Sequence, residues 1–547
     1  MRKTPDYNPV YIEVFKHLFA SIADEMGSIL RKTSYSPNIK ERRDFSCAIF
    51  NPSGQMVAQA AHIPVHLGSM PLSVISAINE FSDPEDPLRP GDMVILNDPF
   101  LGGTHLPDIT LVAPVFLEAA STTPFGYVAS RAHHADIGGM TPGSMPVSRE
   151  IFQEGLIIPP IRLLRAGWID ASVLKLITAN VRTPEERKGD IFAQIGANLR
   201  GINRFHDIIN RFGPNLVYQY MTYLIKYTEK MTRQLISSLP DGVYSFTDYL
   251  DDDGYSTEPI PIVATITIQS DRAIVDFTGS AQQQTGSINA VYSITVSAVY
   301  YVFRCLIGLD VPNNSGCLIP IQVIAPEGSV VNARTPAAVA GGNVETSQRI
   351  VDVLLGALAK ACPDRIPAAS QGTMNNLTIG GWDLKKQQYF TYYETLGGGT
   401  GAQLACHGQP AVHSHMTNTL NTPIEAIEFS YPLRISHYGI RRGSGGKGQW
   451  NGGDGIRRDI QVLSACQVTI LSERRKIAPY GIAGGGNGAC GINVLIRDGV
   501  SVELRSKCSE YLLEGDILSI QTPGGGGFGS IESPSHSGSG YAKQCRD

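Results

Sequence analysis

The longest stretch of helical periodicity in this sequence is the block of residues 181–240, which lies between two regions that contain short strand-like runs. The segment TPEE at residues 183–186 has the pattern of a capping box with proline in the first turn. A Gly-Pro step at residues 213–214 interrupts the apolar repeat, and a second helix is expected over about residues 216–239. We expect these two helices to form an antiparallel pair.

The N-terminal region begins with a well-marked helix. Asn8 is a suitable N-cap, and Pro9 stands at the first helical position, where a missing N–H costs nothing. Apolar residues then recur at three- and four-residue steps: Phe15, Leu18, Phe19, Ile22, Met26, Ile29 and Leu30. Strand-like runs follow at residues 47–50, 93–96, 109–116 and 127–130. Such separate helical and β-rich stretches predict an α+β fold with mixed sheets.

The length of 547 residues allows several domains with large hydrophobic cores. We expect an N-terminal α+β metal-site domain in residues 1–180, a helical hairpin in 181–240, a β-rich α+β domain with Gly-rich loops in 241–529, and a disordered tail in 530–547. Within the third unit, further helices are expected near residues 291–307 and 348–360.

Charge and hydropathy exclude several classes of protein. The formal net charge of -5 argues against a nucleic-acid-binding surface as the main function. The mean hydropathy of -0.05, with 17% charged residues, is typical of a soluble globular protein. A lipid-spanning helix needs about 20 predominantly apolar residues, and we find no such stretch. The cysteines are scattered without a C-x-x-C pair, and the N-terminus lacks the apolar core of a signal peptide, so a cytoplasmic protein with reduced thiols is expected.

Glycine gathers in three segments near the C-terminus, residues 443–455, 484–491 and 524–529. None matches a phosphate-binding P-loop, and a dinucleotide site is only weakly supported. We expect tight β-turns at most of these glycines. The acidic segment at residues 251–254 resembles half an EF-hand loop, but Tyr249 occupies the first ligand position, so a solvated turn is expected there.

The densest group of polar side chains lies in the segments NDPFLGGTHLPDIT and SRAHHADIGG. It contains His105, Asp108, His133, His134 and Asp136, which form a candidate metal site. Imidazole and carboxylate ligands together suit Zn²⁺, Mn²⁺ or Fe²⁺. Any one of these residues could simply satisfy nearby backbone groups. The whole set is harder to explain in that way, because histidine is scarce, with 12 in the chain.

The two segments flank a predicted β-hairpin formed by the third and fourth strand-like runs, whose open ends lie together. This arrangement would bring His105 and Asp108 within reach of His133 and His134. Adjacent residues on a strand point to opposite faces, so at most one of the two neighbouring histidines faces the metal. These arguments leave the choice between His133 and His134 open.

Both segments resemble signature segments of the hydantoinase B/oxoprolinase family. So do EMGSILRKTSYSPNIKERRDFSCAIF at residues 25–50, IPVHLGSM at 63–70, AVHSHMTNTLNTPIEAIE at 411–428 and TPGGGGFG at 522–529. The resemblance implies an ATP-dependent enzyme that opens cyclic amides such as a hydantoin or 5-oxoproline, acting on a carbonyl-phosphorylated intermediate. It also implies an actin-like, hydantoinase A-like partner subunit that binds ATP, and hence a hetero-oligomer.

The resemblance further implies roles for single residues. The family's ligands for a divalent transition metal fall on Asp44, His105, Asp108 and His133. The first histidine of the pair is thereby selected, and His134 and Asp136 are left as candidate catalytic acid/base residues. Asp44 would not have been chosen otherwise, because it lies beside Arg43 and could simply be a salt-bridged carboxylate.

A second polar group contains His407, His413 and His415. The last two would share a face of an extended chain and could form a second metal pair, although hydrogen-bonded structural histidines are the commoner case. The sequence departs from the family here, with Gln403 and His407 where relatives more often carry Arg and Asp, so the substrate stays open. Weaker candidates for a place in the site are His62, His66, Glu394 and Arg434.

Two alternatives to cyclic amide hydrolysis are kept. A sister branch of the family contains ATP-dependent ketone carboxylases, which would show bicarbonate dependence. The other alternative is a non-catalytic scaffold subunit. It predicts that His105→Ala leaves turnover intact, whereas truncation of the Gly-rich C-terminus disrupts the complex.

Overall fold

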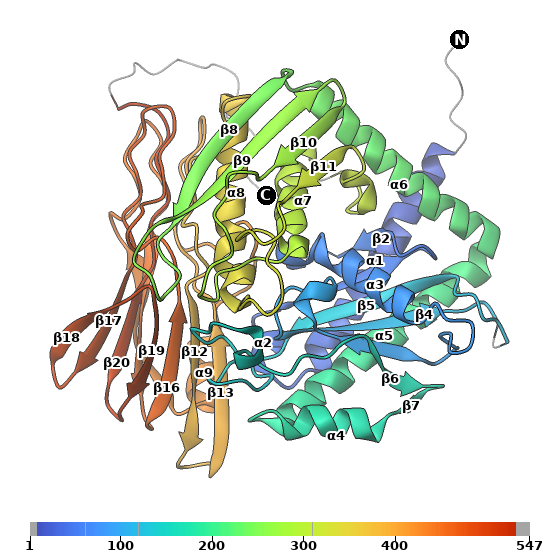
Figure 1. Cartoon of the computed structure of the whole chain (residues 1–547), viewed down its shortest axis with the longest axis horizontal. Helices are drawn as coiled ribbons and strands as arrows, with labels where there is room; N and C mark the ends of the chain where they lie inside the picture. The colour runs from blue at the N-terminus through green and yellow to red at the C-terminus, as the bar shows by residue number, and fades with distance from the viewer. Residues whose placement is uncertain (1–7, 61, 119, 309, 532–547) are drawn as a thin grey trace.

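The structure is a computed structural model that describes residues 8–60, 62–118, 120–308 and 310–531 (Figure 1). Most of the tail expected to be disordered, residues 532–547, lies outside the described residues, and so does Cys545. The division of the chain into domains at residues 180, 240 and 529 stays a prediction.

Helices and strands are mixed along the chain, so the predicted α+β class with several sheets is confirmed (Figure 1). The α-helices are α1 (Pro9–Thr33), α2 (Pro37–Lys40), α3 (Ser69–Glu80), α4 (Ala171–Ala179), α5 (Pro184–Phe212), α6 (Pro214–Ser237), α7 (Tyr292–Ile307), α8 (Ser347–Leu358) and α9 (Ile424–Ser430). The helices predicted near residues 291–307 and 348–360 are α7 and α8.

The first sheet has seven antiparallel strands in the order β2-β1-β5-β4-β3-β6-β7. They are β1 (Phe45–Phe50), β2 (Met56–Gln59), β3 (Met93–Leu96), β4 (Asp108–Val115), β5 (Gly126–His133), β6 (Ile161–Arg165) and β7 (Trp168–Ile169). Alternate residues of the central strands enter two separate cores. Ile49 and Leu111 join the core that contains α1 and α5, whereas Phe50 and Val112 join the core that contains α3. Helices therefore cover both faces, and the ends of the central strands lie in the protein interior.

Helix α1 begins as predicted. The Asn8 side chain accepts a hydrogen bond from the Val10 amide at 3.0 Å, and Pro9 is the first helical residue. The apolar face of α1 is buried and packs along α5 and against β1. Its Phe15 ring stacks on Tyr220 of α6, with centroids 4.7 Å apart. One long helix thus joins the first sheet to the helical block.

Two details of the helical block differ from the prediction. Thr183 precedes α5 but its side chain makes no capping hydrogen bond, and Glu186 bonds its neighbour Arg187 instead of closing a capping box. The sequence also predicts one apolar face along α5 that includes Phe192 and Leu199, but in the structure these two side chains are exposed, 40% and 47% respectively. The break between α5 and α6 lies at Gly213, whose φ of +80° favours glycine.

The second sheet has four strands in the order β11-β10-β9-β8. They are β8 (Gly242–Leu250), β9 (Ile260–Gln269), β10 (Arg272–Asp276) and β11 (Ile321–Ile324). Buried residues alternate along β9, and its buried face, together with β8, packs against α8. A π-helix over Gly342–Thr346 leads directly into α8. Such short π-helical turns are frequent at functional sites.

Two further antiparallel sheets form the C-terminal part, with orders β13-β12-β16-β19 and β14-β15-β20-β17-β18. Their strands are β12 (Asn376–Asp383), β13 (Gln388–Glu394), β14 (Leu433–Arg441), β15 (Gly455–Val462), β16 (Cys466–Leu471), β17 (Ile492–Arg497), β18 (Val500–Leu504), β19 (Lys507–Leu512) and β20 (Ile517–Gln521). Residues from both sheets enter one core, including Leu377, Ile460, Val468 and Leu518. The two sheets lie together at the left of Figure 1.

The Gly-rich segments are not mainly β-turns, which corrects the prediction. Within the three predicted segments, positive φ values are found at Gly443, Gly484 and Gly529. The other glycines allow backbones to pack directly on one another. A Cβ atom at Gly525 would lie 2.0 Å from the Thr400 carbonyl oxygen, and the Gly525 amide donates to the Gly453 carbonyl at 2.9 Å. Close backbone approach, rather than turn conformation, requires glycine there.

The acidic segment is not a solvated turn, which is a second correction. Asp251, Asp252 and Asp253 are all buried. Asp251 accepts hydrogen bonds from the backbone of residues 475 and 477, and Asp252 pairs with Lys476 at 2.8 Å. The carboxylates therefore tie the end of β8 to the segment that follows β16.

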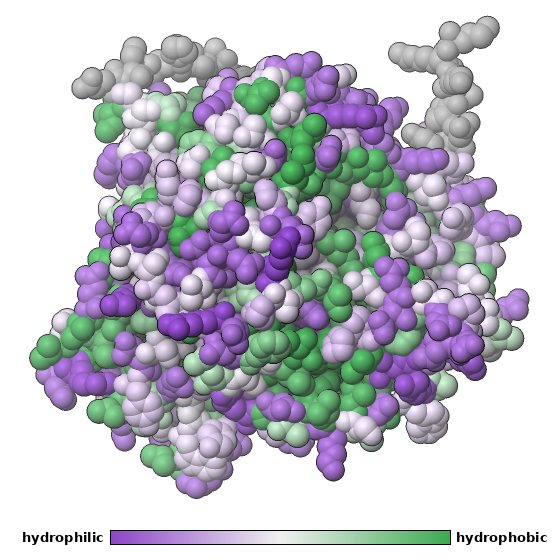
Figure 2. Space-filling model, viewed as in Figure 1, coloured by the Kyte–Doolittle hydropathy of each residue, from purple (hydrophilic) through white to green (hydrophobic). Residues whose placement is uncertain are grey.

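Hydrophilic and hydrophobic residues are interspersed over the face shown in Figure 2. Among the described residues no helix is both long and apolar enough to span a membrane. Among the described residues, no cysteine forms a disulfide bond.

Candidate metal centre

The β4–β5 hairpin carries the predicted ligands at its open end. Asp108 begins β4, His133 ends β5, and the two residues are paired across the ladder. His105 comes from the loop before β4, where the Asp108 amide donates to the His105 carbonyl at 3.1 Å. The loop begins at Gly102, with φ of +89°, where a Cβ would lie 2.5 Å from the Leu72 backbone. This tight turn brings His105 to the strand end.

The three side chains form one compact cluster. The Nε2 atom of His105 lies 3.1 Å from Nδ1 of His133 and 3.4 Å from Oδ1 of Asp108. His133 Nδ1 lies 3.4 Å from the same oxygen. All three residues are buried, and the three donor atoms lie within 4.8 Å of one another. Two imidazoles and one carboxylate are a common donor set for a divalent transition metal.

Hydrogen bonding alone does not satisfy this cluster. A neutral imidazole carries one N–H, so a proton cannot bridge every pair of the three converging atoms. Burial lowers the pKa of His133 more than the nearby carboxylates raise it, which favours the neutral ring. The outer nitrogens, Nδ1 of His105 and Nε2 of His133, are buried without a hydrogen-bond partner. The donor set therefore fits a divalent cation at the point where His105, Asp108 and His133 converge.

The second oxygen of Asp108 is held by other residues. Oδ2 accepts a hydrogen bond from the Thr104 hydroxyl and lies 3.3 Å from Nε2 of His66. His66 in turn contacts the Ser46 hydroxyl at 2.9 Å. Burial alone would raise the pKa of Asp108, but His105 and His66 more than offset it and hold that pKa well below the usual range. Asp108 is thus an ionised carboxylate with one oxygen directed to the two imidazoles.

Asp44, the fourth predicted ligand, lies at the same cavity but outside the compact cluster. Its carbonyl accepts from the His133 amide at 3.0 Å, and its side chain lines the cavity with Asp108 and His133. Arg42 lies 3.9 Å from its carboxylate. Burial raises the pKa of Asp44, partly offset by His133. Its role as a ligand stays a prediction.

His134 and Asp136 are directed to other partners. His134 Nε2 lies 2.9 Å from the Gln194 side chain on α5. Asp136 pairs with Arg182 at 2.9 Å and accepts from backbone amides, including that of Gly143. Neither residue lines the cavity beside Asp108 and His133. The acid/base roles predicted for them remain predictions.

Tyr393 and Arg42 form a layer behind His133. The Tyr393 ring stacks on the His133 imidazole, with centroids 4.2 Å apart and planes 12° apart. The Arg42 guanidinium lies 5.0 Å from the centroid of the Tyr393 ring and donates a hydrogen bond to the Thr395 hydroxyl at 2.6 Å. Sequence reasoning missed Tyr393, because it lies about 260 residues from His133 and no local pattern connects them.

The cavity beside the cluster is small, with a volume of ≈ 20 Å³. Its wall includes Val344 from the π-helix and Met416 from the segment with the second group of histidines. About 10–15 Å³ is enough for one water molecule, so the space fits a water or an ion but not a cyclic amide. A substrate would have to enter by displacing part of this wall.

Two buried carboxyl groups near the cluster lack a cationic partner. Burial raises the pKa of Glu154 to about 7, although Ser148 and the amides of Ala340 and Val339 donate to it. Burial also raises the pKa of Glu345, on the π-helix, to about 8. Each has one carboxylate oxygen without a hydrogen-bond partner. Carboxyl groups that titrate near neutrality are suited to moving protons.

The second group of histidines does not join this cluster. His413 contacts Asn421 at 3.3 Å, His415 contacts the Tyr301 hydroxyl at 3.4 Å, and His407 accepts from the Asn451 amide at 2.8 Å. Each ring therefore has its own hydrogen-bond partner. The other weak candidates differ among themselves. Glu394 is buried and forms an ion pair with Arg458, whereas His66 contacts Asp108 of the cluster.

The sequence matches a known family model and several known proteins over most of its length. The family model described as Hydantoinase B/oxoprolinase matches residues 8–531. An uncharacterized protein of Methanocaldococcus jannaschii is 44% identical over 95% of this chain and 90% of its own length. The 5-oxoprolinase of Dictyostelium discoideum is 40% identical over 97% of this chain, but the match spans only 41% of that protein.

A solved structure is similar over nearly the whole chain. The ATP-dependent caprolactamase from Pseudomonas jessenii superposes with a TM-score of 0.89 at 28% identity, over 96% of this chain and 92% of that chain. The chain thus matches nearly all of one solved chain and about two fifths of the 5-oxoprolinase.

Proposed function

This chain belongs to the hydantoinase B/oxoprolinase family, and on that premise we propose that it is the metal-dependent part of an ATP-dependent enzyme that opens cyclic amides. The substrate class is a hydantoin or a lactam such as 5-oxoproline, supported by a 5-oxoprolinase at 40% identity and by a caprolactamase of similar structure. The observation that carries the proposal is the buried cluster of His105, Asp108 and His133.

The chemistry explains why ATP is needed. An unstrained cyclic amide is stabilised by resonance and resists attack by water. Transfer of a phosphoryl group from ATP to the carbonyl oxygen gives an activated imidate and ADP. Water then adds to that carbon, and the ring C–N bond breaks with a proton moving to nitrogen, which leaves an acyl phosphate. A second water hydrolyses the acyl phosphate to the carboxylate and inorganic phosphate. We assign the ATP-dependent step to a hydantoinase A-like partner and the ring-opening step to this chain.

We assign metal binding and the positioning of the metal ligands to separate residues of this chain. His105 Nε2, His133 Nδ1 and Asp108 Oδ1 would hold the divalent metal, with Asp44 as a further ligand. The metal, when bound, supplies a Lewis acid for the developing negative charge. His66 and Thr104 orient Asp108 by its second oxygen, and Tyr393 holds the plane of His133 by stacking. The small cavity limits the water that can reach the reacting carbon.

Metal analysis of the purified, chelator-washed chain is the direct test. We expect about one transition metal ion per chain in the wild type and none in His105→Ala. The matched control is His437→Ala, which removes an exposed histidine on β14 and should keep the metal. Zinc, manganese and iron are measured together. Full metal retention in His105→Ala would overturn the site.

Turnover with the partner subunit and a cyclic amide tests the reaction. We expect His105→Ala to lose several orders of magnitude in turnover while the complex stays intact. Unchanged turnover would favour a scaffold. A rate that depends on bicarbonate would favour the alternative of a ketone carboxylase, because hydrolysis consumes none. Replacing His134 and Asp136 in the same assay decides whether either takes part.

A further inference from the structure

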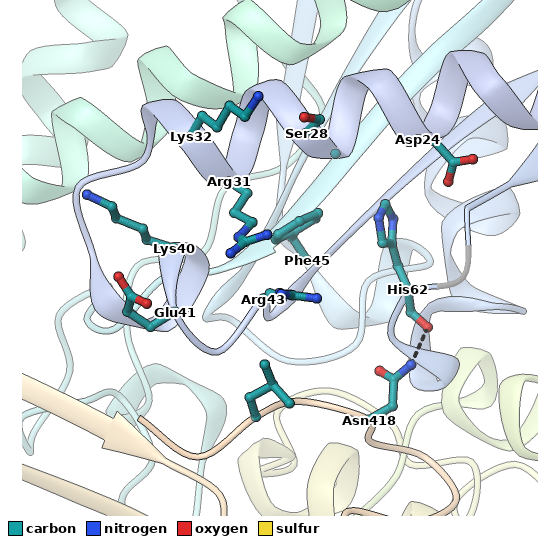
Figure 3. Close-up of a pocket in the computed structure, with 12 residues that line it drawn as sticks. Asp24, Ser28, Arg31, Lys32, Lys40, Glu41, Arg43, Phe45, His62 and Asn418 are labelled. Carbon is teal, nitrogen blue, oxygen red and sulfur yellow. Dashed lines mark hydrogen bonds between the residues drawn. The ribbon is translucent and has the colours of Figure 1, made fainter. Parts of the chain in front are cut away.

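A second, much larger cavity of ≈ 680 Å³ lies between α1 and the segments around residues 40–45, 62 and 418–420 (Figure 3). This volume is within the range of small-molecule sites. Four cationic side chains line it, and two carboxylates reduce the excess to two positive charges. They are Arg31, Lys32, Lys40 and Arg43, with Asp24 and Glu41.

The four cations are not held in ion pairs by the two carboxylates of the cavity. Over the described ranges, no ion pair or side-chain hydrogen bond is found for Arg31, Lys32, Lys40 or Arg43. By contrast, Lys476, at the wall of another cavity, is paired with Asp252 at 2.8 Å. Like charges around one concave space raise its positive potential and attract an anion. The cavity is therefore built to receive negative charge from outside.

The cavity shares a wall with the metal centre. Asp44 lines the small cavity of the cluster, whereas its neighbours Arg43 and Phe45 line the large one. Likewise, His62 and Asn418 line the large cavity, whereas their neighbours Ile63 and Thr417 line the small one. Three separate segments thus have the metal centre on one side and the cationic cavity on the other.

Local backbone features shape this wall. Arg43 adopts a φ of +59°, a conformation that is rare outside glycine and recurs where function requires it. A Cβ at Gly27 of α1 would lie 2.6 Å from the His62 ring, so only glycine admits the imidazole there. His62 Nδ1 accepts from the Cys47 amide at 3.1 Å, and burial lowers the pKa of His62 to about 4. The neutral ring therefore keeps its proton on Nε2 as a donor.

We propose that this cationic cavity binds the phosphate group of an organic phosphate. Arginine and lysine are the side chains that bind phosphate oxygens, by paired hydrogen bonds and by charge. Leu420 and Phe45 add apolar surface for the organic part. The inference rests on the proposed function for its biological ligand, because the activated cyclic amide is itself an organic phosphate. Binding at the cavity can nevertheless be measured without metal, partner or turnover.

Calorimetric titration of the full chain with phenyl phosphate and, separately, inorganic phosphate tests the proposal. We expect both to bind, phenyl phosphate more tightly, and Arg31→Gln/Lys40→Gln to weaken both by at least about tenfold. The matched control pair is Lys226→Gln/Arg272→Gln, which removes two exposed cations far from the cavity in sequence. All variants should unfold at the same temperature, since none loses a contact.

Each result decides one point. No binding by the wild type, or equal weakening in the control pair, would overturn the site, because the effect would then be absent or due to net charge. Equal affinity for the two ligands would overturn the assignment to an organic phosphate. His105→Ala should bind phenyl phosphate like the wild type. If that variant also keeps its metal and turnover, the proposed function fails while the phosphate site stands.

Discussion

The molecule contains two buried polar clusters that differ in how their charges are matched. In the first, which we call the ion-pair network, Arg474 bonds both Asp248 and Asp352, and Lys507 bonds Glu473. In the second, the metal centre, one ionised carboxylate of Asp108 faces three imidazoles, and two ring nitrogens have no partner. The network's main contacts join charges of opposite sign, whereas the metal centre directs two imidazole nitrogens and one carboxylate oxygen at a single point.

This difference separates structure from function. The network joins the end of β8, helix α8, the segment that follows β16, and strand β19, which come from separate parts of the chain. Buried ion pairs contribute little net stability, but breaking one leaves an uncompensated charge. The metal centre, by contrast, joins few elements and keeps converging donor atoms. A cluster whose charges neutralise one another holds distant segments together, whereas one whose donor atoms converge on a single point is available to a metal ion.

The largest expected effect is on the network. Arg474→Met should lower the free energy of unfolding by about 3–5 kcal/mol, because two buried carboxylates, Asp248 and Asp352, lose their closer cationic partner and are left with Arg349 at 3.5 Å. Urea unfolding followed by tryptophan fluorescence measures this. The triple variant with Asp248→Asn and Asp352→Asn should recover part of the loss, since the orphaned charges are removed. A loss below about 1 kcal/mol would mean that these buried ion pairs contribute no more to stability than ion pairs on a protein surface.

A smaller effect is expected behind the metal centre. His66→Ala removes the ring that contacts Asp108 Oδ2 at 3.3 Å and should weaken metal binding by about 10–100-fold, without abolishing it. Competition with a chelator of known affinity gives the ratio. His206→Ala is the matched control, because His206 bonds the Phe116 carbonyl at 2.8 Å and has no contact with the cluster. Equal affinities in the two variants would show that Asp108 needs no support from His66.

The two clusters also show what a sequence can reveal. The cap at Asn8, helices α7 and α8, and the β4–β5 hairpin follow from local periodicity and turn chemistry, and the structure confirms them. The convergence of His105, Asp108 and His133 follows from that hairpin, because its register pairs the first residue of one strand with the last of the other. The addition of Asp44 came only from the family resemblance.

What the sequence could not reveal depends on contacts between distant segments. Asp251 is matched by the backbone of residues 475 and 477, more than 200 residues away, so its acidic neighbourhood looks like a solvated turn. The C-terminal glycines look like turns because local rules concern only φ, whereas Gly525 is required by the approach of the Thr400 backbone. Tyr393 carries no local sign that it contacts a metal ligand, whereas the sequence offers His66 as a weaker candidate, and the structure places it against Asp108.

The smallest expected effect concerns a buried carboxyl that has no cation, unlike the carboxylates of the network. Glu154 has an ordinary pKa of 4.5 when unfolded, and burial raises it to about 7 in the folded protein. Between these pH values the folded state holds a proton that the unfolded state has lost. Folding stability should therefore fall as pH rises through this window, by about 1.4 kcal/mol per pH unit from this group.

The variant Glu154→Gln isolates that contribution. A glutamine oxygen can still accept from Ser148 and from the amides of residues 339 and 340, but it does not titrate. Urea midpoints measured from pH 5 to pH 7 should fall less steeply with pH than in the wild type, while Glu185→Gln on the exposed first turn of α5 should keep the wild-type slope. Identical slopes in all three proteins would mean that Glu154 is ionised throughout this range, and so is compensated like the carboxylates of the network.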